Sequence, residues 1–239
     1  MKAFLPAAGL GSRLRPLTEQ TPKCLVEIAG KPLMAWWMEL FRRHDVSEVL
    51  INTHYHREQV RAFIAQHNEE NGRPYLRESY EEALLGSGGM ILANRDFVKD
   101  EEDFFICYAD NLTQIDLTAL RAFHLRHRPV LTMALSPSNT PKQAGIVSLD
   151  ENNVVTKFEE KPENPESDLA NAGVYVAGQA IFNFFPQGGF IDFSADVLPK
   201  LAGQMYGYPV KEYHIDIGTP ENLRRAKTDW QKLLEEQRR

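Results

Sequence analysis

The sequence has few cysteines, no long apolar run and no excess of positive charge, and each shortage excludes a class of protein. Cys24 and Cys107 are the only cysteines, too few for a disulfide framework or a four-cysteine zinc site, so we expect two reduced thiols. The apolar runs are far shorter than the roughly 20 residues of a membrane-spanning helix. No charged-then-apolar signal peptide precedes the first predicted strand. We therefore expect a cytoplasmic protein with no membrane partner.

The formal net charge of −6 argues against nucleic acid as the main partner, because a polyanion would approach against an unfavourable overall field. A small anionic ligand at a local cluster of basic residues is compatible with this charge. With 43% hydrophobic and 25% charged residues, the 239-residue chain can bury a substantial core and is expected to fold.

Apolar segments rich in β-branched and aromatic residues alternate with segments of helical period, which is typical of βαβ units around a mostly parallel sheet. Strands are predicted at residues 2–8, 48–54, 74–79 and 103–110, the last ending in an acid. Helices are predicted from residue 33 for about a dozen residues, over residues 60–72, and over residues 116–128 with Asp116 as N-cap. A glycine-rich turn is predicted at residues 86–89.

The pattern beyond residue 129 changes to short β-rich pieces, at residues 130–136, 144–150, 154–162 and 171–178. Residues 163–168 are polar and read as a surface loop, and a strand over 208–217 precedes a helix from about residue 220. Nothing marks an interdomain linker. We expect one α/β domain over residues 1–239, made of a half over 1–129 and a half over 130–239.

The stretch LPAAGLGSRLRPLTEQTPK, residues 5–23, combines a pair of glycines with basic side chains directly after the first predicted strand. It is not a P-loop, because Lys31, the only lysine that follows a glycine, precedes Pro32 and Leu25 stands where the first glycine belongs. It is not a dinucleotide fingerprint, because Leu14 replaces the third glycine.

The feature that both motifs share, a pair of glycines directly after a strand, is present in this stretch. Gly9 and Gly11 let backbone amides approach an anion, and the basic side chains that follow can pair with phosphate oxygens. These basic residues are Arg13, Arg15 and Lys23. The residues alone thus predict a phosphate-binding loop.

The string A-A-G-L-G-S-R-L-R-P-L-T, followed by Pro22-Lys23, resembles the signature loop of the sugar-1-phosphate nucleotidylyltransferases. Further segments are similar to that family's motifs in the same order along nearly the whole chain. They are Leu85-Gly86-Ser87-Gly88-Gly89, Ala109-Asp110-Asn111, Gly145 with Glu160-Lys161-Pro162, Asn171-Ala172-Gly173, and Asp216-Ile217-Gly218-Thr219-Pro220.

The resemblance implies a Rossmann-like three-layer α/β/α fold with a mostly parallel mixed sheet, of the nucleotide-diphospho-sugar transferase type. It implies a nucleotide-binding half over 1–129 and a sugar-phosphate-binding half over 130–239. The reaction implied is attack of a sugar 1-phosphate on the α-phosphorus of a nucleoside triphosphate, with release of pyrophosphate. Members often form dimers or tetramers, so a homo-oligomer is compatible with the resemblance.

The chemistry of this reaction calls for cations that neutralise the growing phosphate charge and for hard oxygen ligands that hold Mg²⁺. By resemblance, Asp110 and Asp216 hold the metal, and Arg13, Lys23 and Asp110 are the catalytic residues. The nucleotide-binding residues implied are Leu5, Ala7, Ala8, Gly9, Gly11, Ser12, Arg13, Glu81 and Gly86. The sugar-phosphate-binding residues implied are Asn111, Gly145, Glu160, Lys161 and Asn171.

The sequence leaves the substrates open. Glu81 lies where the family reads the base edge, and a carboxylate accepts two hydrogen bonds from guanine, which favours GTP with mannose- or heptose-1-phosphate. Ala7-Ala8-Gly9 instead resembles UTP- or dTTP-dependent enzymes acting on glucose- or amino-sugar-1-phosphates. Lys23-Cys24-Leu25 resembles CTP-dependent phosphocholine cytidylyltransferases.

Two further classes of function stay open beside the transferase. A nucleotide-sugar-binding regulatory module could keep the fold without activity, but every charged residue that the chemistry requires is present. A nucleotide-dependent kinase would release ADP and a phosphorylated product, whereas the transferase releases pyrophosphate.

Overall fold

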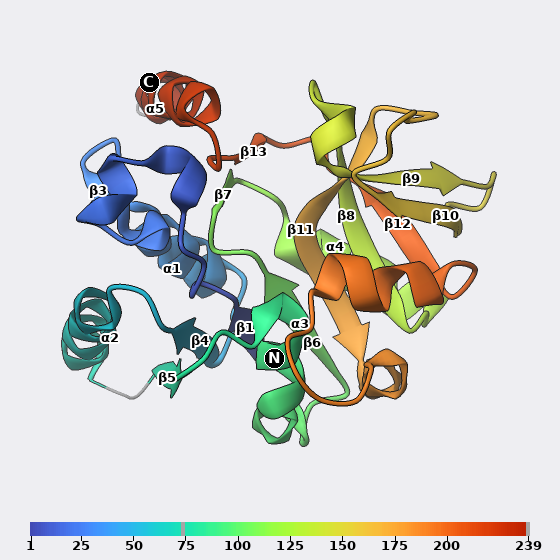
Figure 1. Ribbon diagram of the computed structural model, residues 1–239, viewed down its shortest axis with the longest axis horizontal. Helices are drawn as coiled ribbons and strands as arrows, with labels where there is room; N and C mark the ends of the chain where they lie inside the picture. The colour runs from blue at the N-terminus through green and yellow to red at the C-terminus, as the bar shows by residue number, and fades with distance from the viewer. Residues whose placement is uncertain (73–74, 238–239) are drawn as a thin grey trace.

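A central nine-stranded sheet organises the computed structural model, which describes residues 1–72 and 75–237 (Figure 1). The first half contributes four parallel strands in the order β6-β1-β4-β5. They are β1 (Ala3–Leu5), β4 (Val49–Thr53), β5 (Leu76–Tyr80) and β6 (Asp103–Cys107). Parallel strands leave their carboxyl ends at one edge of the sheet, so the loops that follow them gather there.

The second half continues the same sheet with mostly antiparallel strands. They are β8 (Leu131–Pro137), β9 (Gly145–Leu149), β10 (Val155–Glu160), β11 (Leu169–Gly178) and β12 (Met205–Pro209). β11 pairs antiparallel with β6 of the first half and with β8 of its own half. The sheet therefore runs without interruption across the boundary between residues 129 and 130.

Side chains of β1 alternate between two hydrophobic clusters, which fixes a layer of helices on each face of the sheet. Ala3 and Leu5 face the cluster formed with α1 (Leu33–Arg43), α2 (Arg57–Asn71), α4 (Leu117–His127) and α5 (Pro220–Glu236). Phe4 faces the other cluster, formed with α3 (Gly86–Ala93) and with short helical turns between residues 179 and 201. The fold is a three-layer α/β/α arrangement with a mixed sheet, as the family resemblance implies.

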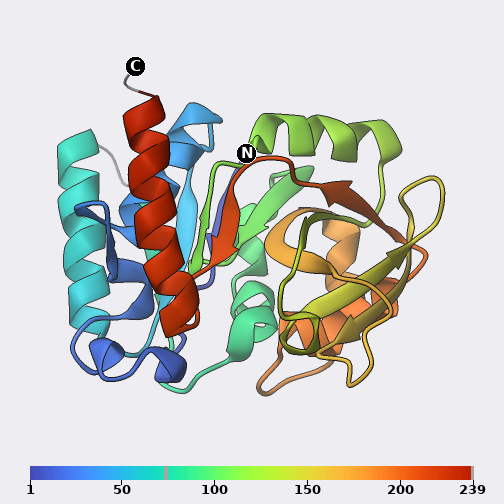
Figure 2. The same ribbon diagram turned by 90° about the horizontal axis from the view of Figure 1, so that it is seen from above.

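The last helix, α5, returns to the first half of the molecule. It is the red helix in Figure 2 and packs beside α1, where the ring centroids of Trp36 and Trp230 lie 5.3 Å apart. Two small sheets complete the structure: β2 (Glu27–Ile28) with β3 (Lys31–Pro32), and β7 (Asn111–Thr113) with β13 (His214–Asp216).

Three sequence predictions about elements are wrong in detail. Residues 86–89 begin a helix rather than form a turn, because the backbone amides of Gly88 and Gly89 donate to the Ile191 carbonyl at 2.9 and 3.1 Å. Strand β6 ends at Cys107, so Asp110 lies in the turn that follows it. The strand predicted over 208–217 is divided between β12 and β13.

The N-cap prediction for Asp116 is confirmed, since its side chain accepts from the Ala119 amide at 2.9 Å. Residues 163–168 contain no helix and no strand, also as predicted. Within residues 1–72 and 75–237, no helix has both the length and the apolar composition needed to cross a bilayer.

Candidate active site

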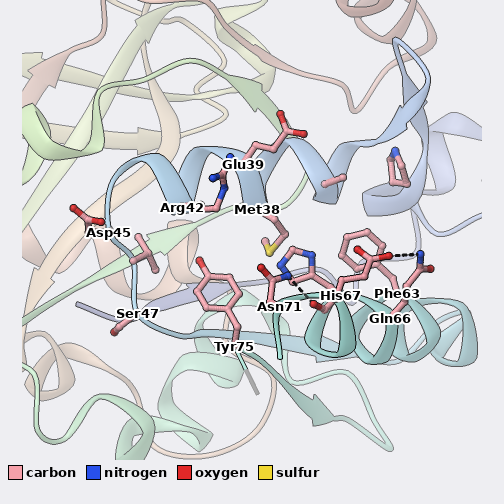
Figure 3. Close-up of a pocket in the computed structure, with 14 residues that line it drawn as sticks. Met38, Glu39, Arg42, Asp45, Ser47, Phe63, Gln66, His67, Asn71 and Tyr75 are labelled. Atoms are coloured by element: carbon pink, nitrogen blue, oxygen red, sulfur yellow. Dashed lines mark hydrogen bonds between the residues drawn. The ribbon is translucent and has the colours of Figure 1, made fainter. Parts of the chain in front are cut away.

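Among the hollows of the described residues, two lie at opposite edges of the sheet, and a third of about 490 Å³ is lined in part by Lys142 and Lys161. The larger of the first two, with a volume of about 780 Å³, is the α1–α2 groove, lined by Met38 of α1, by Phe63 and His67 of α2, and by Tyr75 (Figure 3). It lies at the amino ends of β4 and β5. The smaller, about 320 Å³, lies at the carboxyl ends of β1, β4 and β6. Ligands of open α/β sheets bind at the carboxyl ends, so we assign the functional site to this smaller strand-end pocket despite its size.

Seven of the residues predicted from the sequence line the strand-end pocket. They are Ala7, Ala8, Gly9, Lys23, Glu81, Gly86 and Asp110. They come from the three segments that follow β1, β5 and β6, which the parallel strand order brings to one edge. The structure thus brings together the glycine loop, the proposed base loop and one of the two predicted metal ligands.

Lys23 lies between the two predicted metal ligands. Its Nζ is 2.6 Å from Asp110 Oδ2 and 3.5 Å from Asp216 Oδ1. The antiparallel pairing of β7 with β13 sets Asp216 opposite Asn111, and the Ile217 amide donates to the Asp110 carbonyl at 3.0 Å. This local pairing explains how aspartates more than a hundred positions apart in the sequence reach one lysine.

The three charges at this point change one another's pKa values. Burial alone would lower the pKa of Lys23, but the charges of Asp110 and Asp216 raise it above its ordinary value. Burial alone would raise the pKa of Asp110, but the charge and hydrogen bond of Lys23 hold it below the usual range. Burial and the nearby charge of Asp110 raise the pKa of Asp216. Lys23 is therefore a firmly protonated cation.

Arg13 reaches the same place from the glycine loop. A Cβ atom added to Gly218 would lie 2.7 Å from Arg13 Nη2, 2.8 Å from Asp216 Oδ1 and 3.0 Å from Lys23 Nζ. These three charged groups therefore surround the backbone of Gly218, and a side chain at this position would displace at least one of them. Two cations and two carboxylates converge at the rim of the strand-end pocket.

The remaining residues predicted to bind the nucleotide lie in the core, in or directly after the glycine loop, and at the start of α3. Leu5 is fully buried in β1 and does not line the strand-end pocket, so its predicted contact with a nucleotide stays a prediction. Gly11 and Ser12 form the turn into a short helix over Ser12–Leu14, which presents Arg13 at the surface. Gly86 has φ of +80°, and an added Cβ would collide with the Ile191 carbonyl.

The predicted sugar-phosphate residues do not line the strand-end pocket of the described chain. Asn111 is buried and donates to the Ala172 carbonyl at 2.9 Å, while Asn171 accepts from the Gly173 amide at 2.9 Å. Lys161 is 64% exposed and pairs with Glu160 at 3.1 Å. A Cβ added to Gly145 would meet Glu160 Oε2 at 2.8 Å. Their predicted contacts with a sugar phosphate stay predictions.

Several residues of the strand-end pocket are absent from the sequence prediction. Asn52, at the end of β4, accepts from the amides of Ala7 and Ala8, and Tyr108 follows β6 with its hydroxyl 3.3 Å from Ser87 Oγ. Phe190, 64% exposed, and Asp192 reach the pocket from the second half. The strand predicted over 48–54 indicates only that Asn52 lies near a strand end.

The donor set fits a magnesium ion bound jointly with substrate. Among residues 1–72 and 75–237 there is no cluster of three or more His, Cys, Asp or Glu side chains. The protein can therefore supply the carboxylates of Asp110 and Asp216, and phosphate oxygens would supply further ligands, a combination that Mg²⁺ favours.

Comparison with known families gives an independent result. A family model described as nucleotidyl transferase matches residues 2–232. The D-glycero-alpha-D-manno-heptose 1-phosphate guanylyltransferase of Aneurinibacillus thermoaerophilus is 31% identical over 237 residues, covering 98% of this chain and 100% of the relative. The mannose-1-phosphate guanylyltransferase of Mycobacterium tuberculosis is 32% identical over 232 residues, covering 95% of this chain.

The chain spans 60 to 64% of the length of the mannose-1-phosphate guanylyltransferases that it matches. Among solved structures, a putative glucose-1-phosphate thymidylyltransferase from Bacillus anthracis superposes with a TM-score of 0.85 at 21% identity. That match covers 95% of this chain and 94% of the other, and it supports the fold.

Proposed function

The chain belongs to the nucleotidyl transferase family, and on that premise we propose that it joins a nucleotide to a sugar 1-phosphate. A phosphate oxygen of the sugar 1-phosphate attacks the α-phosphorus of a nucleoside triphosphate in line. A new P–O bond forms, the bond from the α-phosphorus to the bridging oxygen breaks, and pyrophosphate leaves. The observation that carries the proposal is that Lys23 and Asp110, which line the strand-end pocket, meet Arg13 and Asp216 beside it.

Each charged group has a role that its surroundings support. Lys23 is protonated and partly buried, so it offers a fixed positive charge to the α-phosphate as negative charge grows there. Arg13 is exposed beside it and can pair with the outer phosphates through its planar guanidinium. Asp110 and Asp216 would hold Mg²⁺, which neutralises phosphate charge and orients the triphosphate when bound.

For the substrates, we propose GTP with a heptose- or mannose-1-phosphate. The support is the heptose 1-phosphate guanylyltransferase that matches this chain over the full length of that relative. UTP or dTTP with another sugar 1-phosphate is the second candidate, favoured by Ala7-Ala8-Gly9 and by a UTP–glucose-1-phosphate uridylyltransferase of Synechocystis at 27% identity.

Pyrophosphate release distinguishes these possibilities. The protein would be incubated with Mg²⁺, each nucleoside triphosphate in turn and a panel of sugar 1-phosphates plus phosphocholine. We expect pyrophosphate and a nucleotide sugar, fastest with GTP and a heptose- or mannose-1-phosphate. Release of a nucleoside diphosphate instead would indicate a kinase. Tight nucleotide binding with no pyrophosphate from any pair would refute the enzymatic proposal in favour of a binding module.

A further inference from the structure

A buried pair of polar side chains connects two loops of the strand-end pocket. Asn52 is 4% exposed and Glu81 is 3% exposed. One contacts the glycine loop, defined here as residues 6–11, and the other contacts the β5–α3 connection, residues 81–85. Their role depends on the nucleotide-binding function proposed above.

Asn52 is oriented by its contacts with the glycine loop. Its Oδ1 accepts from the Ala7 amide at 2.6 Å and from the Ala8 amide at 3.2 Å. Backbone amides can only donate, so the oxygen must face them and the side-chain NH₂ must face the other way. That NH₂ donates to Glu81 Oε1 at 2.8 Å.

Glu81 uses its second oxygen on the β5–α3 connection. Its Oε2 accepts from the Leu85 amide at 3.0 Å, directly before α3 begins at Gly86. Its backbone is held as well, since the Glu81 amide donates to the Thr53 carbonyl at 2.9 Å and His54 Nδ1 lies 2.9 Å from the Glu81 carbonyl. Each carboxylate oxygen already has a donor from the protein.

We infer that Asn52 and Glu81 are positioning residues that hold the glycine loop and the β5–α3 connection in one geometry. An ionised carboxylate can accept about four hydrogen bonds, and the two protein donors on Glu81 already fix its orientation. Here one oxygen serves Asn52 and the other serves the start of α3. The nucleotide therefore meets two loops whose separation is set by one continuous chain of hydrogen bonds.

The pair can be exchanged without losing any of these hydrogen bonds. In Asn52→Asp alone, two acceptors face each other at the Asn52–Glu81 contact. In Glu81→Gln alone, the new side chain has a single oxygen, whereas the Asn52 NH₂ and the Leu85 amide each need an acceptor. In the double variant, the Gln amide donates to the new carboxylate and its oxygen accepts from the Leu85 amide, so every partner is satisfied and the net charge is unchanged.

The test measures KM for GTP, KM for the sugar 1-phosphate and the ratio of kcat/KM for GTP over UTP. We expect each single variant to raise KM for GTP about five- to 100-fold, the range for a broken buried hydrogen bond. KM for the sugar 1-phosphate should stay within about twofold. The double variant should return to within about threefold of the native KM for GTP, with the base preference unchanged.

Three results would overturn the inference. The first is a double variant no better than the product of the single effects. The second is a double variant that recovers affinity but changes its base preference, which would make Glu81 a direct reader of the base. The third is a native KM for GTP in either single variant. Should a single variant fail to fold, the double variant decides alone by the same criteria.

Asn68→Asp provides a matched control. Asn68 of α2 donates its NH₂ to the Leu76 carbonyl at 2.8 Å, at the amino end of β5, so this substitution also opposes two acceptors away from the pocket. It should lower the melting temperature without changing KM for GTP. Calorimetric binding of GTP to the same variants tests the pair even if the native protein releases no pyrophosphate, which separates this inference from the proposed reaction.

Discussion

At the scale of single residues, one lysine serves two carboxylates. Lys23 Nζ makes its short contact with Asp110 and a longer one with Asp216, and the side chain of Asp216 is 48% exposed. Lys23 holds the pKa of Asp110 below its usual range, whereas partial burial and the charge of Asp110 raise the pKa of Asp216, which makes the longer contact with Lys23. Lys23 therefore neutralises the charge of Asp216 less than that of Asp110, and Asp216 is the carboxylate that can bind another cation.

The first prediction concerns Asp110→Asn. The substitution keeps the shape of the side chain but removes its charge, so it weakens both the hold on Lys23 and the proposed metal site. We expect kcat for pyrophosphate release to fall at least about 100-fold, the scale of losing one group that stabilises transition-state charge. Steady-state assays with GTP and the best sugar 1-phosphate measure it, and circular dichroism checks the fold.

Asp103→Asn is the matched control for this substitution. Asp103 is a buried carboxylate on β6 that pairs with Arg121 at 3.3 Å, at the opposite end of the strand. Its loss should reduce stability with little change in kcat. If Asp110→Asn retains near-native turnover, or if the two variants lose turnover equally, Asp110 has no part in the metal site.

The charged residues of the site could be predicted because they lie in local sequence motifs. Lys23 follows Pro22, and Asp110 and Asp216 follow or end short strands, so each carries its own signal. Asn52 and Tyr108 lie in no such motif. Their roles depend on the register of β1 with β4 and β6, which cannot be read from one sequence. Phe190 reaches the pocket only through the packing of residues 188–192 on α3.

At the scale of elements, helix α4 and strand β8 are joined by a buried polar contact. His124 Nδ1 lies 2.9 Å from Thr132 Oγ1, and His124 is 5% exposed. Burial lowers the pKa of His124 to about 4, although the charge of Asp103 opposes the shift in part. The folded protein therefore keeps this imidazole neutral at pH values where an unfolded chain would protonate it.

The second prediction follows from that pKa. Between about pH 6.5 and pH 4 the unfolded state binds a proton at His124 that the folded state does not, so stability falls as the pH falls. From pH 7 to pH 5 this group should cost about 2 kcal/mol of unfolding free energy. Urea unfolding at pH 7, 6 and 5, compared with His124→Gln, measures the difference.

The Gln variant has no titrating group at this position, so its stability should decline less steeply toward pH 5. Every other group that titrates in this range is common to both proteins, and the difference between the two curves isolates His124. Parallel curves would mean that His124 is protonated as readily in the folded state as in the unfolded state.

Element prediction succeeded where the period is strong and failed where tertiary contacts decide. α1 and α5 show clear apolar stripes, and both helices lie where the sequence predicts them. α3 begins with Gly86-Ser87-Gly88-Gly89, a composition typical of a turn. Its first turn is helical because the Ile191 carbonyl, about a hundred residues away, accepts its free amides.

At the scale of the whole molecule, the two halves share one sheet and one site. Strand β11 pairs with β6 and β8 at the same time, so the halves cannot separate without breaking the sheet. The strand-end pocket is closed from the second half by Phe190 and Asp192, and β13 carries Asp216 back to Lys23 of the first half. Ligand binding at this pocket should therefore stabilise the entire fold.

The third prediction tests that coupling through the metal. Lys23 already occupies the space between Asp110 and Asp216, so Mg²⁺ alone should change the melting temperature little. Mg²⁺ and GTP together, at a hundredfold excess over the dissociation constant, should add about 3 kcal/mol of stability and raise the melting temperature by about 6 to 12 °C. A chelator should remove most of this rise and stop pyrophosphate release.

In the Asp216→Asn variant, the part of the rise in melting temperature that depends on Mg²⁺ should be smaller, while the effect of GTP without metal should persist. An equal rise with Mg²⁺ alone, or one that survives the chelator, would contradict joint binding of metal and nucleotide by the two aspartates.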